Sequence, residues 1–200
     1  MSESTSSPAR PTRRQQIIEV AAELFAERGF HGVSIYDLGT AMGTSGAALY
    51  KHFAGKDALL GAMLVDISER LLSEGTARAE AARASAGDDE GADAVLEALV
   101  AWHVEFALTK PALITVQFRD LASLAEADRH TVRRLQRRYV ELWVGAIRAA
   151  VGADEAHARS AAHAVFGLIN STPHSARLGP DDMGAMLQRM ARAALHAARP

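Results

Sequence analysis

Side chains that can hold a phosphate gather between Ser34 and Lys56 of this 200-residue chain. Tyr50 offers a hydroxyl donor. Lys56 offers a positive charge at the predicted start of a helix, where free backbone N–H groups also favour a phosphate. These groups position an anion and break no bond, so the chemistry they suggest is binding.

Catalytic and metal-binding patterns are missing from the sequence. The eight histidines are scattered, with no pair four residues apart, and no second carboxylate–x–x–His pair joins Asp154 and His157 to suggest a di-iron bundle. The absence of cysteine excludes disulfides, zinc–thiolate sites and thiol catalysis. No glycine-rich loop ends in Gly-Lys-Ser/Thr, so nucleotide hydrolysis is unsupported. We therefore predict no enzymatic activity, no cofactor and no metal site.

Two short helices joined by a tight turn are predicted to position the polar groups. Ser34 and Asp37 form a capping-box-like start, Gly43 allows a sharp turn, and Thr44 or Ser45 restarts the helix with a hydroxyl cap. A buried face is marked by apolar residues at helical spacing: Ile35, Leu38, Met42, Leu49 and Phe53. This pattern is typical of a helix-turn-helix.

The stretch resembles the DNA-binding end of the tetracycline-repressor (TetR) family of bacterial regulators. The matching residues are Phe25, Gly29, Phe30, Ser34, Asp37, Leu38, Gly43, Ser45, Leu49, Tyr50, Lys51, His52, Phe53, Lys56, Asp57, Leu59 and Leu60. The resemblance implies a helix-turn-helix DNA-binding domain of three helices at 12–55. It also implies a larger helical domain at 56–200 that binds a ligand and dimerises. The expected function is a ligand-responsive transcriptional regulator of bacteria, more often a repressor than an activator.

Phosphate contacts are implied for Tyr50, His52 and Lys56, and also for Ser34 and Tyr36. For His52 the alternative is a partly buried, hydrogen-bonded histidine. Tyr50 could be half core and half DNA contact.

The base-reading positions depart from the family pattern. Family members often carry a polar residue where this chain has Gly46 and a threonine where it has Ala48; Gly39 replaces the usual alanine. Base contacts would then rest on Thr44, Ser45, Lys51 and methyl contacts from Ala47 and Ala48 to thymine. We predict that DNA shape carries an unusual share of specificity. A helical interaction module without DNA binding remains the rival interpretation.

Residues 1–11 are rich in serine, proline and arginine and are predicted to be a disordered basic arm. The arm is either a solvated tail or, as the resemblance favours, a DNA contact that continues into Arg13. The net charge of −2 requires any DNA-binding surface to be a local patch. No signal peptide or membrane span is predicted, and the absence of cysteine fits a reducing cytoplasm.

The rest of the chain is predicted to be helical, giving an all-α protein without strands. Capping residues and periodicity place helices at 12–28, 56–86, 92–109, 128–151, 154–171 and from 180 onward, with a short helix after Pro111 and a surface loop at 87–91. The last two long helices are the expected homodimer surface, which presents two recognition helices to a palindromic operator. The proposed interface residues are Ala161, Val165, Leu168, Ile169, Met186, Leu187, Met190 and Ala194. The alternative is that they complete the protomer core.

A small-molecule pocket in the second domain is implied by the resemblance alone. The candidate lining residues are Trp102, His103, Phe106, Phe118, Arg119, Tyr139, Trp143, Phe166 and Asn170, each of which could equally be core. Arg119, among apolar neighbours, needs an anion or a buried carboxylate, unless its pair with Asp120 lies at the surface.

Five arginines form a basic band between Arg129 and Arg138. The band is either a solvated face paired with nearby carboxylates or a site for the phosphates of an acyl-coenzyme A. The segment from Phe166 to Ser175 is also similar to family members that respond to fatty-acid or sterol acyl thioesters.

Overall fold

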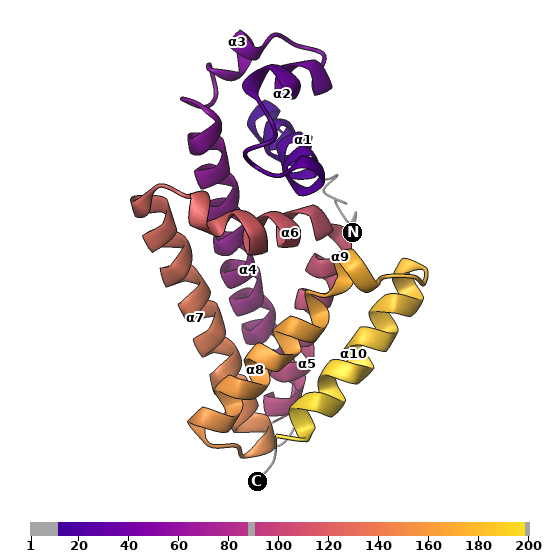
Figure 1. The fold of residues 1–200 in the computed structure, drawn as a ribbon. Helices are drawn as coiled ribbons and strands as arrows, with labels where there is room; N and C mark the ends of the chain where they lie inside the picture. The colour runs from indigo at the N-terminus through magenta and orange to yellow at the C-terminus, as the bar shows by residue number, and fades with distance from the viewer. Residues whose placement is uncertain (1–11, 88–90, 199–200) are drawn as a thin grey trace, which may run out of the picture.

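A computed structural model describes residues 12–87 and 91–198, and within them every regular element is a helix. In chain order the elements are α1 (Arg13–Arg28), α2 (Ile35–Ala41), α3 (Gly46–Leu49), α4 (Lys56–Ser85), α5 (Gly91–Thr109), α6 (Pro111–Asp120), the 3₁₀ turn η1 (Leu121–Ser123), α7 (Glu126–Val151), α8 (Glu155–Ile169), α9 (Thr172–Ser175) and α10 (Pro180–His196). The all-α prediction is confirmed. In Figure 1, α1 to α3 form one end of the molecule, and α6 crosses between them and the other helices.

The first two helices begin where capping residues predict. Thr12 and Gln15 form a reciprocal capping box at α1, and Ser34 and Asp37 form a second one at α2. Gly29 ends α1 with φ of 79°, a backbone conformation that favours glycine. The buried face of α1 packs Phe25 edge-on against Phe30, whose ring centroid lies 5.3 Å away. The capping signals therefore fix the entry angles of both helices.

The turn after α2 brings two backbones unusually close. Gly43 adopts φ of 62°, as the turn prediction requires. A Cβ atom on Gly39 would lie 2.7 Å from the amide nitrogen of Gly46, so only glycine fits at position 39 without displacing α3. The expected cap is not confirmed: Ser45 occupies the N-cap position, but its hydroxyl makes no capping hydrogen bond, and α3 is a single turn.

One long helix, α4, joins the end formed by α1 to α3 to the remaining helices. Its 30 residues correspond to about 45 Å. It packs against α5 and α7, while α10 packs against α5 and α8 (Figure 1). Gly61 of α4 faces Asp128 of α7, and the Asp128 carboxylate occupies the space that a side chain at position 61 would need. The two helices therefore lie in direct backbone-to-side-chain contact close to the end formed by α1 to α3.

Other boundaries differ from prediction by a few residues. Helix α7 begins at Glu126 rather than at 128, and α8 ends at Ile169, after which the separate helix α9 was not predicted. Gly91 already belongs to α5, and the rest of the predicted loop lies largely outside the described residues, as does the predicted arm at 1–11. Gly152 ends α7 in a left-handed conformation, as predicted.

Within the described residues, no single helix is long and apolar enough to cross a membrane. The bent pair formed by α5 and 111–123, whose axes meet at 89°, passes the same test by length and composition only.

Candidate nucleic-acid interface and effector cavity

The outer surface of α2 and α3 carries exposed polar and aromatic side chains. Tyr36 is 76% exposed and Tyr50 is 58% exposed, which is unusual for rings that serve only the core. The other predicted contacts that are exposed are Arg13, Ser34, Ser45, Ala47, Lys51 and His52, whereas Thr44 and Ala48 are half-buried. Beneath them, Leu38, Leu49 and Phe53 are buried and hold the surface rigid. His52 is exposed rather than a partly buried core histidine.

Ser34 is occupied within the protein. Its hydroxyl accepts from the Asp37 amide and donates to the Asp37 carboxylate, which also accepts from the Ser34 amide at 2.8 Å. These hydrogen bonds lower the pKa of Asp37 below its ordinary value. A phosphate contact from Ser34 would therefore have to share a hydroxyl that already stabilises α2.

Lys56 has a role that differs from the predicted phosphate contact. Its Nζ donates to the carbonyl oxygens of Phe30 and Val33, each at 2.8 Å, and lies 4.4 Å from the centre of the Phe30 ring. The ammonium therefore holds together the loop between α1 and α2 by bonding to two of its carbonyl oxygens. Two of the three ammonium hydrogens are thus taken by backbone carbonyls, and the predicted phosphate contact would have to use the third.

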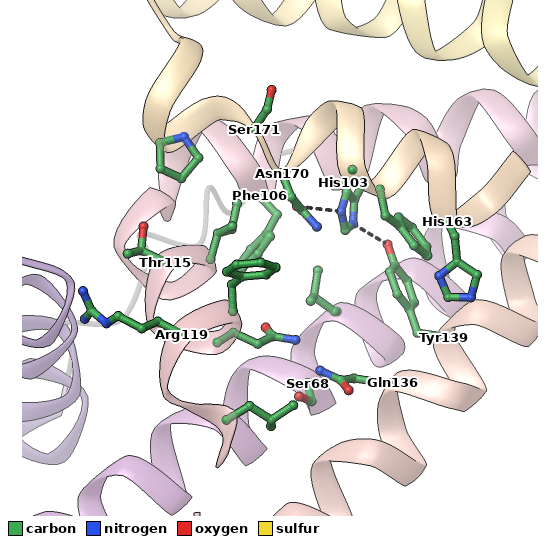
Figure 2. Close-up of a pocket in the computed structure, with 18 of the residues that line it drawn as sticks. Ser68, His103, Phe106, Thr115, Arg119, Gln136, Tyr139, His163, Asn170 and Ser171 are labelled. Carbon is green, nitrogen blue, oxygen red and sulfur yellow. Dashed lines mark hydrogen bonds between the residues drawn. The ribbon is translucent and has the colours of Figure 1, made fainter. Parts of the chain in front are cut away.

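A cavity of about 890 Å³ lies between α4, α5, α6, α7 and α8. Exposed lining residues at His163, Gly167 and His174 bring it to the surface beside α8 and α9. Of the predicted lining residues, those on its wall are His103, Phe106, Phe118, Arg119, Tyr139, Phe166 and Asn170 (Figure 2). Sequence reasoning missed further wall residues, among them Ser68, Ile114, Thr115, Gln117, Gln136, Val140 and Ser171. None of these seven residues is aromatic or charged, so nothing in its side-chain type singled it out.

Two predicted lining residues are packed behind the wall. Trp102 is buried, donates its indole N–H to the Leu71 carbonyl oxygen at 3.3 Å and lies under the Arg78 guanidinium. Trp143 is fully buried against Phe166, with ring centroids 5.0 Å apart. Neither ring lines the cavity, so for both the core alternative is the one observed.

Phe118 and Arg119 both point their side chains away from the cavity interior. Phe118 is 93% exposed. The Arg119 guanidinium donates to the carbonyl oxygens of Phe25 and Ala26 in the last turn of α1 (Figure 2). It also pairs with the buried Asp120 carboxylate, with 3.1 Å between Arg119 Nη2 and Asp120 Oδ2. The predicted need of Arg119 for a buried carboxylate is met, and the guanidinium additionally caps a helix of the DNA-binding end.

The comparisons with known proteins match two separate stretches of the chain. Residues 17–63 match the model described as "Bacterial regulatory proteins, tetR family", and residues 89–196 match the model described as "Tetracyclin repressor-like, C-terminal domain". The chain belongs to the TetR family. The first match spans most of α1, then α2, α3 and the start of α4, and it assigns the helix-turn-helix of this family to α2 and α3.

Individual relatives of this TetR-family chain are distant. A relative named HTH-type transcriptional repressor KstR2, from Rhodococcus jostii, is 29% identical over 140 residues. That stretch is 70% of this chain and 65% of the relative, so the chain spans slightly less than two thirds of the relative's length. The solved structure of the TetR regulator PfmR from Thermus thermophilus is 25% identical, with a TM-score of 0.73, over 93% of this chain and 97% of that one. The structure of AibR in complex with isovaleryl coenzyme A and operator DNA is 18% identical, with a TM-score of 0.72, over 90% and 97%.

The basic band of this regulator lies on α7. Arg133, Arg134, Arg137 and Arg138 are exposed and make no ion pair among the described residues. The neighbouring Glu141 is paired instead with Arg159 of α8, at 2.7 Å, and this contact lowers the pKa of Glu141. These four residues therefore form an exposed face, as the solvated-face alternative expects, but without the carboxylate partners that it included.

The predicted dimer surface divides into buried and accessible parts. Val165, Ile169 and Leu187 are 2% exposed or less and belong to the protomer core, so their assignment to an interface is corrected. The accessible remainder consists of Ala161, Leu168, Met186, Met190 and Ala194, of which Met190 is 46% exposed. The interface, if formed by α8 and α10, uses the outer faces of these helices.

Proposed function

We propose that this TetR-family chain is a cytoplasmic repressor that binds a palindromic operator as a homodimer and is released by a small molecule. Residues 12–55 are proposed to contact DNA, and residues 56–200 to dimerise and bind the effector. The observation that carries the proposal is the Arg119 bridge, because one residue of the cavity wall hydrogen-bonds directly to α1 of the DNA-binding end.

DNA contact is supported by the exposed face of α2 and α3. Tyr36, Tyr50, Lys51 and His52 form a rim of donors, as phosphate contacts require. Between them, Ala47 offers a methyl group and Ser45 a hydroxyl that no capping bond uses. Such a surface would position the protein on the phosphate backbone of the DNA and would make few hydrogen bonds to base edges. We therefore retain the proposal that operator shape contributes much of the specificity.

Dimerisation is supported by the small size of the proposed DNA-reading helix, α3. Helix α3 is a single turn, and one copy of this DNA-binding unit would bind duplex DNA weakly. Two such units held by paired α8 and α10 helices would reach successive major grooves roughly 34 Å apart. The exposed Met190 and the alanines beside it supply the apolar surface for this pairing.

The proposed effector is an amphipathic molecule of the acyl-coenzyme A type. The cavity is large enough for an acyl chain. Arg133 and Arg137 flank the lining residue Gln136 in the sequence of α7, and exposed guanidinium groups without an ion pair suit phosphates. The AibR structure, a complex with isovaleryl coenzyme A and operator DNA, is compatible with this class. The mechanism is a population shift, in which effector binding favours a conformation whose two recognition helices no longer fit the operator.

A gel-shift titration with DNA from upstream of the protein's own gene tests DNA binding. We expect a shift at low ionic strength that added dodecanoyl-coenzyme A reverses. The variant Lys51→Ala should weaken the shift, whereas the control variant Arg177→Ala, in the loop before α10, should not. A folded dimer that ignores every promoter fragment at low salt would contradict the proposal.

The base-reading proposal has its own test. Replacing individual thymines of the operator with uracil removes the C5-methyl groups that Ala47 and Ala48 are proposed to contact. Affinity should fall at one or two positions in each half-site. Unchanged affinity at every position would contradict methyl readout.

A further inference from the structure

Three cavity-wall residues from different helices form one hydrogen-bonded chain. His103 of α5 lies between Tyr139 of α7 and Asn170 at the end of α8 (Figure 2). Its Nδ1 is 3.3 Å from the Tyr139 hydroxyl oxygen, and its Nε2 is 3.1 Å from Asn170 Oδ1. All three residues also line the cavity.

The direction of each hydrogen bond follows from the charge of the imidazole. Burial lowers the pKa of His103 to about 4, so the ring is neutral and carries one N–H. Asn170 Oδ1 is an acceptor and takes that hydrogen from Nε2. Nδ1 must then accept from the Tyr139 hydroxyl, which stays protonated because burial raises its pKa. The chain therefore runs from Tyr139 through His103 to Asn170.

This arrangement leaves one group of the chain without a partner. The amide Nδ2 of Asn170 has two hydrogens and no hydrogen-bond partner among the described residues, and the side chain is half-buried at the cavity. This amino group is not fully buried and is open to the cavity, so a ligand whose acceptor takes its hydrogen bond gains affinity. The unpaired part of the Asn170 amide is therefore a hydrogen-bond donor.

Charge at this end of the cavity is disfavoured. The described lining residues include no Asp, Glu or Lys, and the guanidinium of the one arginine among them is directed at α1. A ligand carboxylate or ammonium would thus lose water without gaining an opposite charge. The neighbouring wall is aromatic, with Phe166 stacked on Tyr139 at 5.8 Å and an interplanar angle of 15°. A flat or slender apolar body would pack against these rings.

We propose that Asn170 is a specificity-determining residue whose amide donates to a neutral carbonyl group on a ligand with an otherwise apolar body. Tyr139 and His103 act as positioning residues that keep the Asn170 oxygen turned inward and its amino group turned toward the ligand. The inference rests on the proposed role of the cavity as the effector site and adds the chemical group that the site recognises.

Four diphenyl compounds of similar shape test the inference by calorimetric titration of the full chain. Benzophenone and diphenylmethane differ only by a carbonyl in place of a methylene, while diphenylacetate and benzhydrylammonium carry a charge. The wild-type protein should bind benzophenone about tenfold more tightly than the other three, in line with the 10–200-fold range typical of small differences in a pocket.

Variants at position 170 separate recognition from structure. Asn170→Leu should weaken benzophenone about tenfold and leave diphenylmethane within about twofold, because only the donor is lost. Asn170→Asp should reverse the order in favour of benzhydrylammonium. The positioning role of Tyr139 predicts that Tyr139→Phe narrows the preference for benzophenone over diphenylmethane without abolishing diphenylmethane binding.

Equal wild-type affinities for benzophenone and diphenylmethane, an equal loss of both in Asn170→Leu, or binding of none of the four compounds would overturn the inference. The proposed effector control fails separately. If benzophenone binds with the expected preference but leaves operator affinity unchanged, the carbonyl site stands and the release mechanism does not. If dodecanoyl-coenzyme A releases the operator while no preference for the carbonyl is found, the reverse holds.

Discussion

Arg119 of α6 donates a hydrogen bond from its guanidinium to the carbonyl oxygen of Phe25, in the last turn of α1. The same carbonyl accepts from the Gly29 amide at 2.8 Å, so Arg119 adds a second donor to an established helix end. A residue of the cavity wall is thereby attached to the backbone of the DNA-binding end, while Asp120 holds the guanidinium in position.

Arg119→Met should uncouple effector binding from operator release. The variant keeps much of the apolar stem and loses the hydrogen bonds to α1. We expect effector affinity within about threefold of wild type, but a ratio of operator affinities without and with effector that falls about tenfold, since such couplings are typically worth 1–3 kcal/mol. Paired titrations of operator and effector measure both quantities. Lys110→Met, which removes only the exposed ion pair with Glu19, is the control and should change neither by much.

Lys56→Met should act on stability rather than on phosphate binding. Loss of the two hydrogen bonds to Phe30 and Val33 should lower the free energy of unfolding by about 1–3 kcal/mol. The slope of log affinity for the operator against log salt should stay unchanged. Lys51→Met should do the opposite, with normal thermal unfolding and a salt slope reduced by about one. A reduced slope in the Lys56 variant would restore the phosphate role.

Gly39→Ala should be destabilising although it raises helix propensity. The new methyl group would meet the backbone of Ser45 and Gly46, which cannot move without shifting α3. We expect a loss of about 1–3 kcal/mol in stability and weaker operator binding. Gly145→Ala, inside α7 with no atom in the way, is the matched control and should stabilise by up to about 1 kcal/mol. Denaturant unfolding of both variants checks the difference in sign.

His103 should make the fold sensitive to mild acid. Its pKa is about 4 in the folded protein and ordinarily 6.5, so the unfolded state binds the proton more readily. Stability is then fully present above pH 6.5 and falls as the pH drops toward 4, by up to about 3 kcal/mol. In His103→Gln this part of the pH dependence should vanish, whatever the absolute stability of the variant. Urea unfolding between pH 4 and 7.5 gives both curves, and parallel curves would contradict the assignment.

Met190→Glu should separate the protomers. The side chain is exposed on α10, so the change should leave the protomer fold intact and place a charge in the proposed interface. Leu178→Glu, which charges another exposed apolar residue just before α10, should leave the dimer unchanged. Sedimentation velocity at several concentrations distinguishes the two. A Met190 variant that remains dimeric would move the interface elsewhere.

Local signals in the sequence were sufficient to predict most helix boundaries. They were insufficient to predict the hydrogen bonds between distant parts of the chain. Thr12, Ser34 and Gly152 act on residues within a few positions of themselves, and each does what its type predicts. Lys56 and Arg119 bond to backbone carbonyls 23 to 94 positions away, and a carbonyl is the same in every residue. The type of residue that carries the carbonyl therefore gives no sequence signal for such a hydrogen bond.

The aromatic part of the cavity wall was predictable, together with Asn170 and Arg119, whereas most of its small and neutral polar residues were not. Phe106, Tyr139 and Phe166 stand out by size, whereas Ser68 and Gln136 enter the wall because of how α4 and α7 are rotated. The proposed dimer residues failed for a related reason. Val165 and Leu187 lie on apolar stripes, but periodicity does not say whether a stripe faces its own core or another chain.

The Asp128 carboxylate occupies the space beside Gly61, so the residue types that are tolerated at these two positions depend on each other. A single exchange to alanine at position 61 collides with the aspartate, and a shorter residue at 128 alone leaves a void. Each single substitution should destabilise the protein, so we expect positions 61 and 128 to change together in evolution. Among close homologues, a larger residue at 61 should accompany a smaller one at 128, and the spacing of α4 and α7 should be inherited as a unit.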